Sequence, residues 1–206
     1  MPDAPATTAA PRTARGERTA TSLRAAAREV FADVGYAAAR VEDVVAAAGV
    51  SHGTFYTYFE NKAAVLDALV DETATALLGV AEEPWEGEDV EATLEAVIGR
   101  FVDLILRDAA VIATWLEASA HEPYFRERLR GVRERVARQV AGHIAPIART
   151  GHDPEVVAGA LVAMVEGYAT RGLMTADATD RRAAVRTLAR LWAGGLHHVA
   201  EGRGAP

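Results

Sequence analysis

The chain has 206 residues, of which 50% are hydrophobic and 25% are charged. A chain of this length and composition can bury a substantial core, which excludes a wholly disordered protein. It has no cysteine, which excludes disulfides, thiolate metal sites and a cysteine nucleophile, and its formal net charge is −7.

The charge is distributed unevenly. Residues 1–62 carry equal numbers of basic and acidic side chains, so the remainder carries the whole charge of −7. This asymmetry is of interest in a candidate nucleic-acid-binding protein, because only the first third escapes repulsion from phosphates. No apolar run approaches the roughly 18 residues of a membrane span, and the first residues lack a secretory signal pattern. We therefore expect a cytoplasmic chain with no membrane partner.

Apolar residues at helical spacing define the first part of the chain. The expected elements are a disordered tail over residues 1–17, rich in Ala, Thr, Pro and Gly, and helices over about 18–34, 41–48 and 51–59. The stripe of the first helix comprises Leu23, Ala26, Ala27, Val30, Phe31 and Val34. Gly35 and Gly49 can take the positive φ that ends a helix, and Ser51 can cap the next one.

The same spacing continues to the end of the chain. Further helices are expected over about 61–77, 94–105, 111–119, 125–140, 153–173 and 181–199, with a loop at 82–88. Asn61 can cap the first of these, and Asp153-Pro154 is a helix start with proline at the first helical position. The helix over 153–173 is apolar nearly all round. The sequence therefore predicts an all-α fold of about nine helices, with no strand.

Two of the expected helices meet at a short glycine turn. A helix, a glycine turn and a second helix form the skeleton of a helix-turn-helix, whose second helix enters the major groove of DNA. Gly49 permits the turn, Val50 can plug it into the core, and Ser51 caps the following helix. Phe55 and Phe59, at i and i+4, can anchor that helix inward. The other faces of the helix carry residues that are available for contacts with phosphates and base edges, namely His52, Thr54, Tyr56, Thr57 and Tyr58.

Residues 31–62 contain glycines, aromatic residues and the only lysine of the chain in a distinctive order and spacing. They are Phe31, Gly35-Tyr36, Val41, Asp43-Val44, Ala48-Gly49-Val50-Ser51, Gly53-Thr54-Phe55-Tyr56, Tyr58-Phe59 and Asn61-Lys62. With these residues the sequence resembles the TetR (tetracycline-repressor-type) family of transcriptional regulators. The resemblance implies a helix-turn-helix DNA-binding domain over 18–62 and an effector-binding and dimerisation domain over 63–206.

The resemblance also implies a set of DNA-binding residues: Arg40, Ser51, His52, Gly53, Thr54, Tyr56, Tyr58 and Lys62. The residues from Ser51 to Thr54 begin the recognition helix, nearest the bases, and the two tyrosines offer hydroxyls to phosphates or pack on sugars. Lys62 places a cation beside a phosphate oxygen. Arg40 can reach a phosphate, and it stands where the family often has a small hydroxyl residue that caps the second helix.

The expected recognition helix has few side chains suited to direct readout of bases. No Arg, Asn or Gln lies between Ser51 and Phe59, so the strong bidentate contacts to guanine and adenine are missing. We hypothesise that three arginines on the flexible tail, Arg12, Arg15 and Arg18, add backbone or minor-groove contacts that offset this deficit.

For the acidic remainder, the resemblance implies a bound small molecule and a dimer. An all-round apolar helix with glycines must bury every face, which favours homodimerisation through the last two helices. A twofold dimer separates its recognition helices by about 34–36 Å, which predicts a palindromic operator in double-stranded DNA. Candidate ligand-binding residues are Phe101, Ile105, Trp115, Phe125, Met164 and Tyr168, although each is also typical of plain core.

Three other signals have ordinary interpretations. Glu117 and His121 at i, i+4 could be a polar end of the pocket, but an exposed helical pair is the preferred interpretation. His197 and His198 suggest a solvated tail rather than a metal site. Six arginines from Arg126 to Arg138 are interrupted by Glu127 and Glu134. They indicate a solvated face on which Glu127–Arg130 and Arg130–Glu134 can pair.

These observations favour one function over two others. The leading prediction is a homodimeric repressor, without cofactor or metal, that an unknown small-molecule effector releases from its operator. The alternatives are a ligand-independent DNA-binding activator or architectural protein, and an all-helical enzyme whose helix-turn-helix is only structural. No nucleophile motif, phosphate loop or carboxylate pair supports catalysis, so we expect no enzyme.

Overall fold

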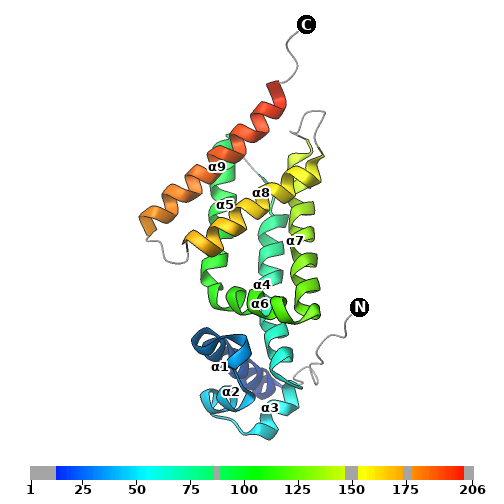
Figure 1. Cartoon of the computed structure of the whole chain (residues 1–206), viewed down its shortest axis with the longest axis vertical. Coiled ribbons are helices and arrows are strands. Elements are labelled where there is room, and N and C mark those ends of the chain that lie inside the picture. Colours follow the sequence, from blue (N-terminus) through cyan, green and yellow to red (C-terminus); the bar gives the residue numbers. More distant parts are fainter. Residues whose placement is uncertain (1–12, 86–88, 147–152, 174–177, 202–206) are drawn as a thin grey trace. The chain divides into compact units, whose positions relative to one another are not determined.

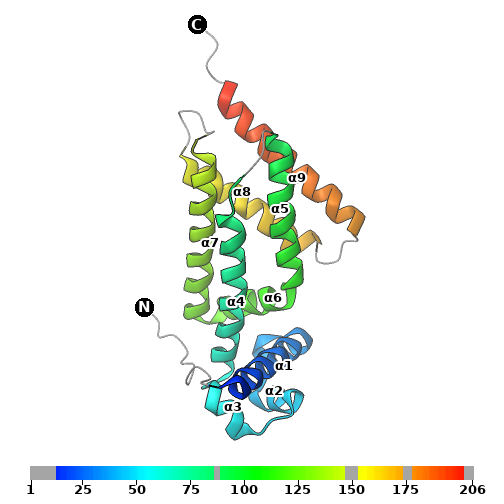
Figure 2. The same ribbon diagram turned by 180° about the vertical axis from the view of Figure 1, so that it is seen from behind.

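The computed structural model describes residues 13–85, 89–146, 153–173 and 178–201 (Figures 1 and 2). Over these ranges the chain forms nine α-helices and one short π-helix, with no strand. The prediction of an all-α fold with about nine helices is therefore confirmed. None of the helices in these ranges combines the length and the apolar character that a membrane crossing requires.

The helices divide into two compact units. The first unit extends to Ala74 and also includes Ala110–Arg130, and the second comprises Thr75–Ala109 and the chain from Gly131 onward. The first unit contains α1 (Ala14–Ala38), α2 (Val41–Ala48), α3 (His52–Tyr58), the start of α4 (Lys62–Glu82), most of α6 (Ala109–His121) and the start of α7 (Pro123–Ile144). The second contains the rest of α4 and α7, α5 (Val90–Arg107), α8 (Pro154–Tyr168), the π-helix η1 (Ala169–Leu173) and α9 (Ala178–Glu201).

The first helix starts earlier than the sequence pattern indicates. The Thr13 hydroxyl caps α1 by accepting a hydrogen bond from the backbone N–H of Gly16 at 3.1 Å. The residues just before Arg18 therefore belong to α1 and not to a tail. Arg15 and Arg18 lie exposed on this helix, which corrects their assignment to a flexible segment, and Arg12 lies outside the described residues. The composition of this segment predicts disorder, but the Thr13 cap stabilises a helix that includes its last residues.

The apolar stripe of α1 forms the centre of the first unit. Leu23, Ala27 and Phe31 are each at most 3% exposed. Val34 was predicted to continue this stripe but is 51% exposed. The reason is that α1 is interrupted at the next residue, Gly35, whose φ of 75° and ψ of 173° are not helical.

In the second unit, α9 crosses and packs against α5, and α8 and η1 also contact α5 (Figures 1 and 2). The predicted start of α8 is confirmed, because the Asp153 carboxylate accepts a hydrogen bond from the backbone N–H of Glu155 at 2.9 Å. Three large apolar side chains of this layer remain exposed in the chain. They are Val156 and Tyr168 on α8 and Leu191 on α9.

Candidate nucleic-acid interface

The turn between α2 and α3 has the geometry that its sequence predicts. Gly49 adopts a left-handed conformation, with φ of 65° and ψ of 32°, and ends α2. The backbone N–H of the next residue, Val50, donates to the carbonyl of Val45 at 3.1 Å. The Ser51 hydroxyl then accepts the backbone N–H of Thr54 at 3.1 Å and caps α3. The expected cap and left-handed turn are confirmed.

Two phenylalanines hold α3 from behind. Phe55 is fully buried, Phe59 is 2% exposed, and their ring centroids lie 5.9 Å apart. The side chain of His52 is exposed, and Tyr56 is 50% exposed although its ring edge packs on Phe55. Because Phe55 and Phe59 are buried while His52 and Tyr56 remain exposed, α3 presents polar side chains on a fixed support.

The remaining predicted residues of the turn and α3 lie beside this face. Ser51 and Gly53 are exposed, and Thr54 and Tyr58 are half-buried. The Thr54 hydroxyl lies 2.9 Å from the Ser51 hydroxyl, so this part of the predicted set is also engaged in capping the helix.

Arg40 immediately precedes α2, with an exposed side chain. Its backbone N–H donates to the Asp43 carboxylate at 3.0 Å. This hydrogen bond stabilises the start of α2, where the resemblance predicts a small hydroxyl residue as the helix cap.

Lys62 lies in a different environment from the other predicted residues. Its ammonium donates to the backbone carbonyls of Tyr36 at 2.7 Å, Ala37 at 3.1 Å and Ala39 at 3.0 Å. It also lies 4.7 Å from the centroid of the Tyr36 ring, a cation–π distance. The side chain is half-buried against the end of α1.

Glu117 on α6 has a role that its sequence spacing does not reveal. Its carboxylate accepts the backbone N–H groups of Tyr36 at 2.8 Å and Ala37 at 3.0 Å, and these bonds hold its pKa below the usual value. The interpretation of Glu117 and His121 as a merely exposed pair is therefore wrong. The partners are too far apart in the chain for a helical pattern to connect them.

Tyr36 is the centre of this arrangement. Its side chain is buried, and its hydroxyl donates to the Glu122 carboxylate at 2.5 Å. Burial, together with this carboxylate, raises the pKa of Tyr36 above its usual value. The ring also packs against Phe31 and, edge on, against Phe125, each with centroids 6.0 Å apart. The residue after Gly35 is therefore fixed by backbone, hydroxyl and ring together.

Several of the closely spaced arginines on α7 form ion pairs. Arg128 pairs with Asp71 and lies 3.4 Å from Asp67, and Arg130 pairs with Glu127 at 2.5 Å as expected. The Tyr124 hydroxyl donates to Asp67 at 2.8 Å, and burial raises the pKa of Tyr124 to about 12. Part of this run therefore braces α7 against α4 and is not simply solvated.

The six candidate ligand-binding residues fall into two groups. Trp115 and Phe125 lie in the core of the first unit, where the Trp115 indole N–H donates to the Phe125 carbonyl at 3.2 Å. The other four belong to α5 and α8 of the second unit: Ile105 is buried, Phe101 and Met164 are half-buried and Tyr168 is half-exposed.

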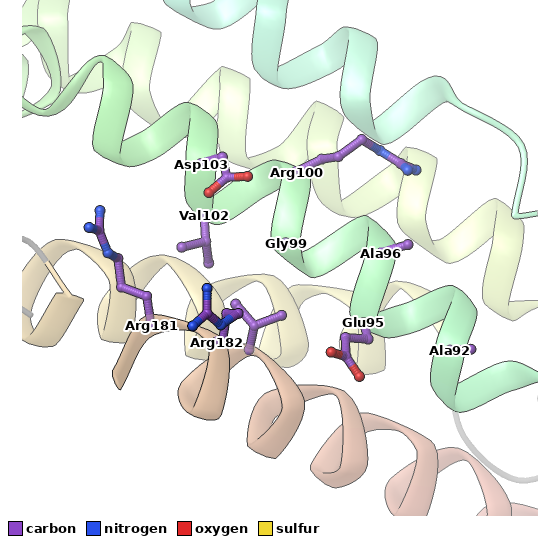
Figure 3. Close-up of a pocket in the computed structure, with 10 residues that line it drawn as sticks. Ala92, Glu95, Ala96, Gly99, Arg100, Val102, Asp103, Arg181 and Arg182 are labelled. Carbon is purple, nitrogen blue, oxygen red and sulfur yellow. The ribbon is translucent and has the colours of Figure 1, made fainter. Parts of the chain in front are cut away.

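A pocket of about 760 Å³ lies between α5 and α9 of the second unit. Figure 3 shows Arg181 and Arg182 extending from α9 toward α5, where Val102 and Asp103 lie. Arg100 also lines the pocket and pairs with Glu83 at 3.0 Å. None of the six candidate ligand-binding residues lines this pocket. Across the described residues, no group of three His, Asp or Glu side chains could hold a metal ion, and the side chains of His197 and His198 lie outside them.

A helix-turn-helix with an anchored, polar recognition helix, followed by an all-helical region, defines a class of transcriptional regulators. The chain matches the family described as "Bacterial regulatory proteins, tetR family" over residues 23–69 and "BetI-type transcriptional repressor, C-terminal" over residues 90–197. The chain belongs to the tetR family of bacterial regulatory proteins. The matching family descriptions and the curated relative name transcriptional regulators, in agreement with the prediction of a regulator and not an enzyme.

One curated relative and two solved structures are similar to the chain. The chain is 28% identical to the HTH-type transcriptional regulator BetI of Ectopseudomonas mendocina (strain ymp), over 80% of this chain and 86% of the relative. Its fold is similar to that of Salmonella enterica GusR, with a TM-score of 0.75 and 21% identity over 87% of this chain and 96% of the other. The fold is also similar to that of the fatty acid degradation regulator FadR from Bacillus halodurans. The TM-score is 0.72, and the two chains are 23% identical over 86% of this chain and 96% of the other.

Proposed function

We propose that this chain is a homodimeric repressor that binds a palindromic operator in double-stranded DNA and is released by a small molecule. The observation that carries the proposal is the polar face of α3, held out by the buried Phe55 and Phe59 behind it. The proposed DNA contacts come from Arg40, Ser51, His52, Gly53, Thr54, Tyr56 and Tyr58. Arg15 and Arg18, exposed on α1, are proposed to add phosphate contacts.

Exposed apolar residues on α8 and α9 support a dimer through these two helices. Val156 is 68% exposed and Leu191 is 57% exposed, and a partner that covers them would remove this apolar surface from water. A second copy of the chain is the simplest partner, because a twofold axis pairs the same surface with itself. Such a dimer repeats α3 at about 34–36 Å, one turn of DNA, and so requires a palindrome.

The effector is proposed to bind among the large apolar residues nominated above. Within the second unit, α5 and α8 contact each other, and Phe101, Ile105, Met164 and Tyr168 are the nominated residues on these two helices. A ligand can change DNA affinity only by binding one state of the protein better than the other. A coupling of about 5- to 150-fold is the ordinary scale of such effects.

The test is a selection from random DNA duplexes with the full chain, followed by titration of the recovered duplex. The proposal predicts a palindromic consensus, two chains per duplex and loss of affinity in His52→Ala, while Gln139→Ala, a change at an exposed site on α7, binds normally. A metabolite set is then screened for release of the bound duplex. Binding that no metabolite releases would favour the ligand-independent activator or architectural protein. Failure to recover any duplex would refute DNA binding.

A further inference from the structure

The peptide groups just after Gly35 are held from both sides by charged side chains of distant helices. On one side, the Glu117 carboxylate of α6 accepts the N–H groups of Tyr36 and Ala37. On the other side, the Lys62 ammonium of α4 donates to the carbonyls of Tyr36, Ala37 and Ala39. We call residues 36–39 with these two side chains the corner clamp. All of its members lie in the first unit.

The hydrogen bonds of Lys62 use its full donor capacity. An ammonium carries three N–H groups, and here three carbonyl oxygens lie within 3.1 Å of it. The face of the Tyr36 ring lies beside the same nitrogen. No donor therefore remains for a phosphate oxygen unless one of these bonds is broken.

The corner clamp stands at the point where the direction of α2 is set. Gly35 interrupts α1, and α2 begins at Val41, with only Arg40 between it and the clamped residues. In turn, α2 packs against both α1 and α3. A change in the conformation of residues 36–39 would therefore shift α2 and, through the Gly49 turn, the recognition helix.

We propose that Lys62 and Glu117 are positioning residues for DNA binding: they fix the corner between α1 and α2, and Lys62 acts through this corner and not through a phosphate. The inference rests on the proposed function, since it concerns how DNA is bound. It assigns to Glu117, which lies outside the helix-turn-helix, a role in operator affinity. It also gives Gly35 a second reason to be glycine, because a Cβ there would lie 2.8 Å from a Glu117 carboxylate oxygen.

The experiment measures operator affinity at several salt concentrations for the full chain, using the duplex recovered by selection. Lys62→Arg separates the two roles. A guanidinium binds phosphate at least as well as an ammonium, but its planar fork cannot donate to three converging carbonyls. Glu117→Gln places an amide NH₂ group against one of the two backbone N–H groups. Arg40→Ala, which removes an exposed cation from the proposed interface, is the contrasting variant.

The corner clamp predicts that Lys62→Arg and Glu117→Gln each lose about 10- to 100-fold in affinity, the ordinary scale for charge-assisted hydrogen bonds. The dependence of log affinity on log salt stays unchanged in both, whereas Arg40→Ala reduces that slope by about 0.9 for each phosphate that the arginine neutralises. Amide hydrogen exchange at Tyr36 and Ala37 accelerates in Glu117→Gln, which reports the corner directly.

Two results would contradict the inference. Wild-type affinity in Lys62→Arg would assign the lysine to a phosphate. If Lys62→Arg does not fold, Glu117→Gln gives the same comparison, and normal affinity there overturns the proposal. These outcomes leave the proposed function intact, because the unaltered chain still binds its duplex. Absence of any binding by the unaltered chain would instead refute both.

Discussion

Replacing Gly35 with alanine adds one methyl group at a position where both the backbone and a neighbouring side chain exclude it. With φ of 75° and ψ of 173°, Gly35 occupies a region almost confined to glycine, where another residue costs about 1–3 kcal/mol. The new Cβ would lie 2.8 Å from a Glu117 carboxylate oxygen, and we expect the shift of this side chain to break its two backbone hydrogen bonds. At about 0.5–1.5 kcal/mol each, these bonds bring the expected loss to about 2–6 kcal/mol.

Chemical denaturation of the first unit measures this loss. Trp115 is buried there, so its fluorescence reports this unit when the other two tryptophans, Trp85 and Trp192, are replaced by phenylalanine. Gly49→Ala is the matched control, because Gly49 also has a positive φ but an added Cβ there would meet no heavy atom within 4 Å, leaving only a backbone cost of about 1–2 kcal/mol. If Gly35→Ala is no more destabilising than Gly49→Ala, the proposed clash with Glu117 is refuted.

Three further predictions concern a cap, the dimer and pH. Ser51→Ala should lower the free energy of unfolding by about 0.5–2 kcal/mol, because the hydroxyl that caps the Thr54 N–H is removed; an unchanged denaturation midpoint would contradict this. Leu191→Glu should convert the dimer to monomers in analytical ultracentrifugation, whereas Val34→Glu, a similarly exposed site on α1, should leave it intact; a dimeric Leu191→Glu would count against the α8–α9 interface. Glu117 has a pKa below its ordinary 4.5 in the folded chain, so its stabilising contribution is present above pH 4.5 and is lost as the pH falls through the folded pKa. The stability difference between the unaltered chain and Glu117→Gln should therefore shrink in acid, and a constant difference would exclude this linkage.

Local sequence patterns predicted several caps and turns of the described residues correctly. Ser51, Asn61 and Asp153 each accept a backbone N–H at the start of the helix they were expected to cap. Gly35 and Gly49 both take positive φ. These features depend on a few neighbouring residues, so their spacing is enough to identify them.

The hydrogen bonds of the corner clamp could not be predicted in this way. Glu117 is about eighty positions from the backbone groups it binds, and helical spacing suggested His121 as its partner. Lys62 was assigned to a phosphate by resemblance, although the fold brings three carbonyls within its reach. Spacing along one helix shows which side chains share a face, but it does not show which distant backbone groups that face will meet.

The start of α1 shows the opposite limitation. The composition of residues 1–17 indicated disorder, yet one hydroxyl on Thr13 caps a helix that begins there. Exposed residues at its first turns give the helix no apolar stripe that a periodicity argument could detect. The prediction from average composition therefore put the start of α1 too late in the chain.

The central claim is that α3 enters the major groove of DNA twice in one dimer. Methylation of guanine N7 by dimethyl sulfate tests it directly, because this atom is accessible only from the major groove. With the selected duplex, the account predicts guanines protected in two half-sites whose centres are about 10 base pairs apart, and loss of both protections in His52→Ala. Protein-bound DNA with unprotected major-groove guanines, or with a single protected cluster, would contradict it.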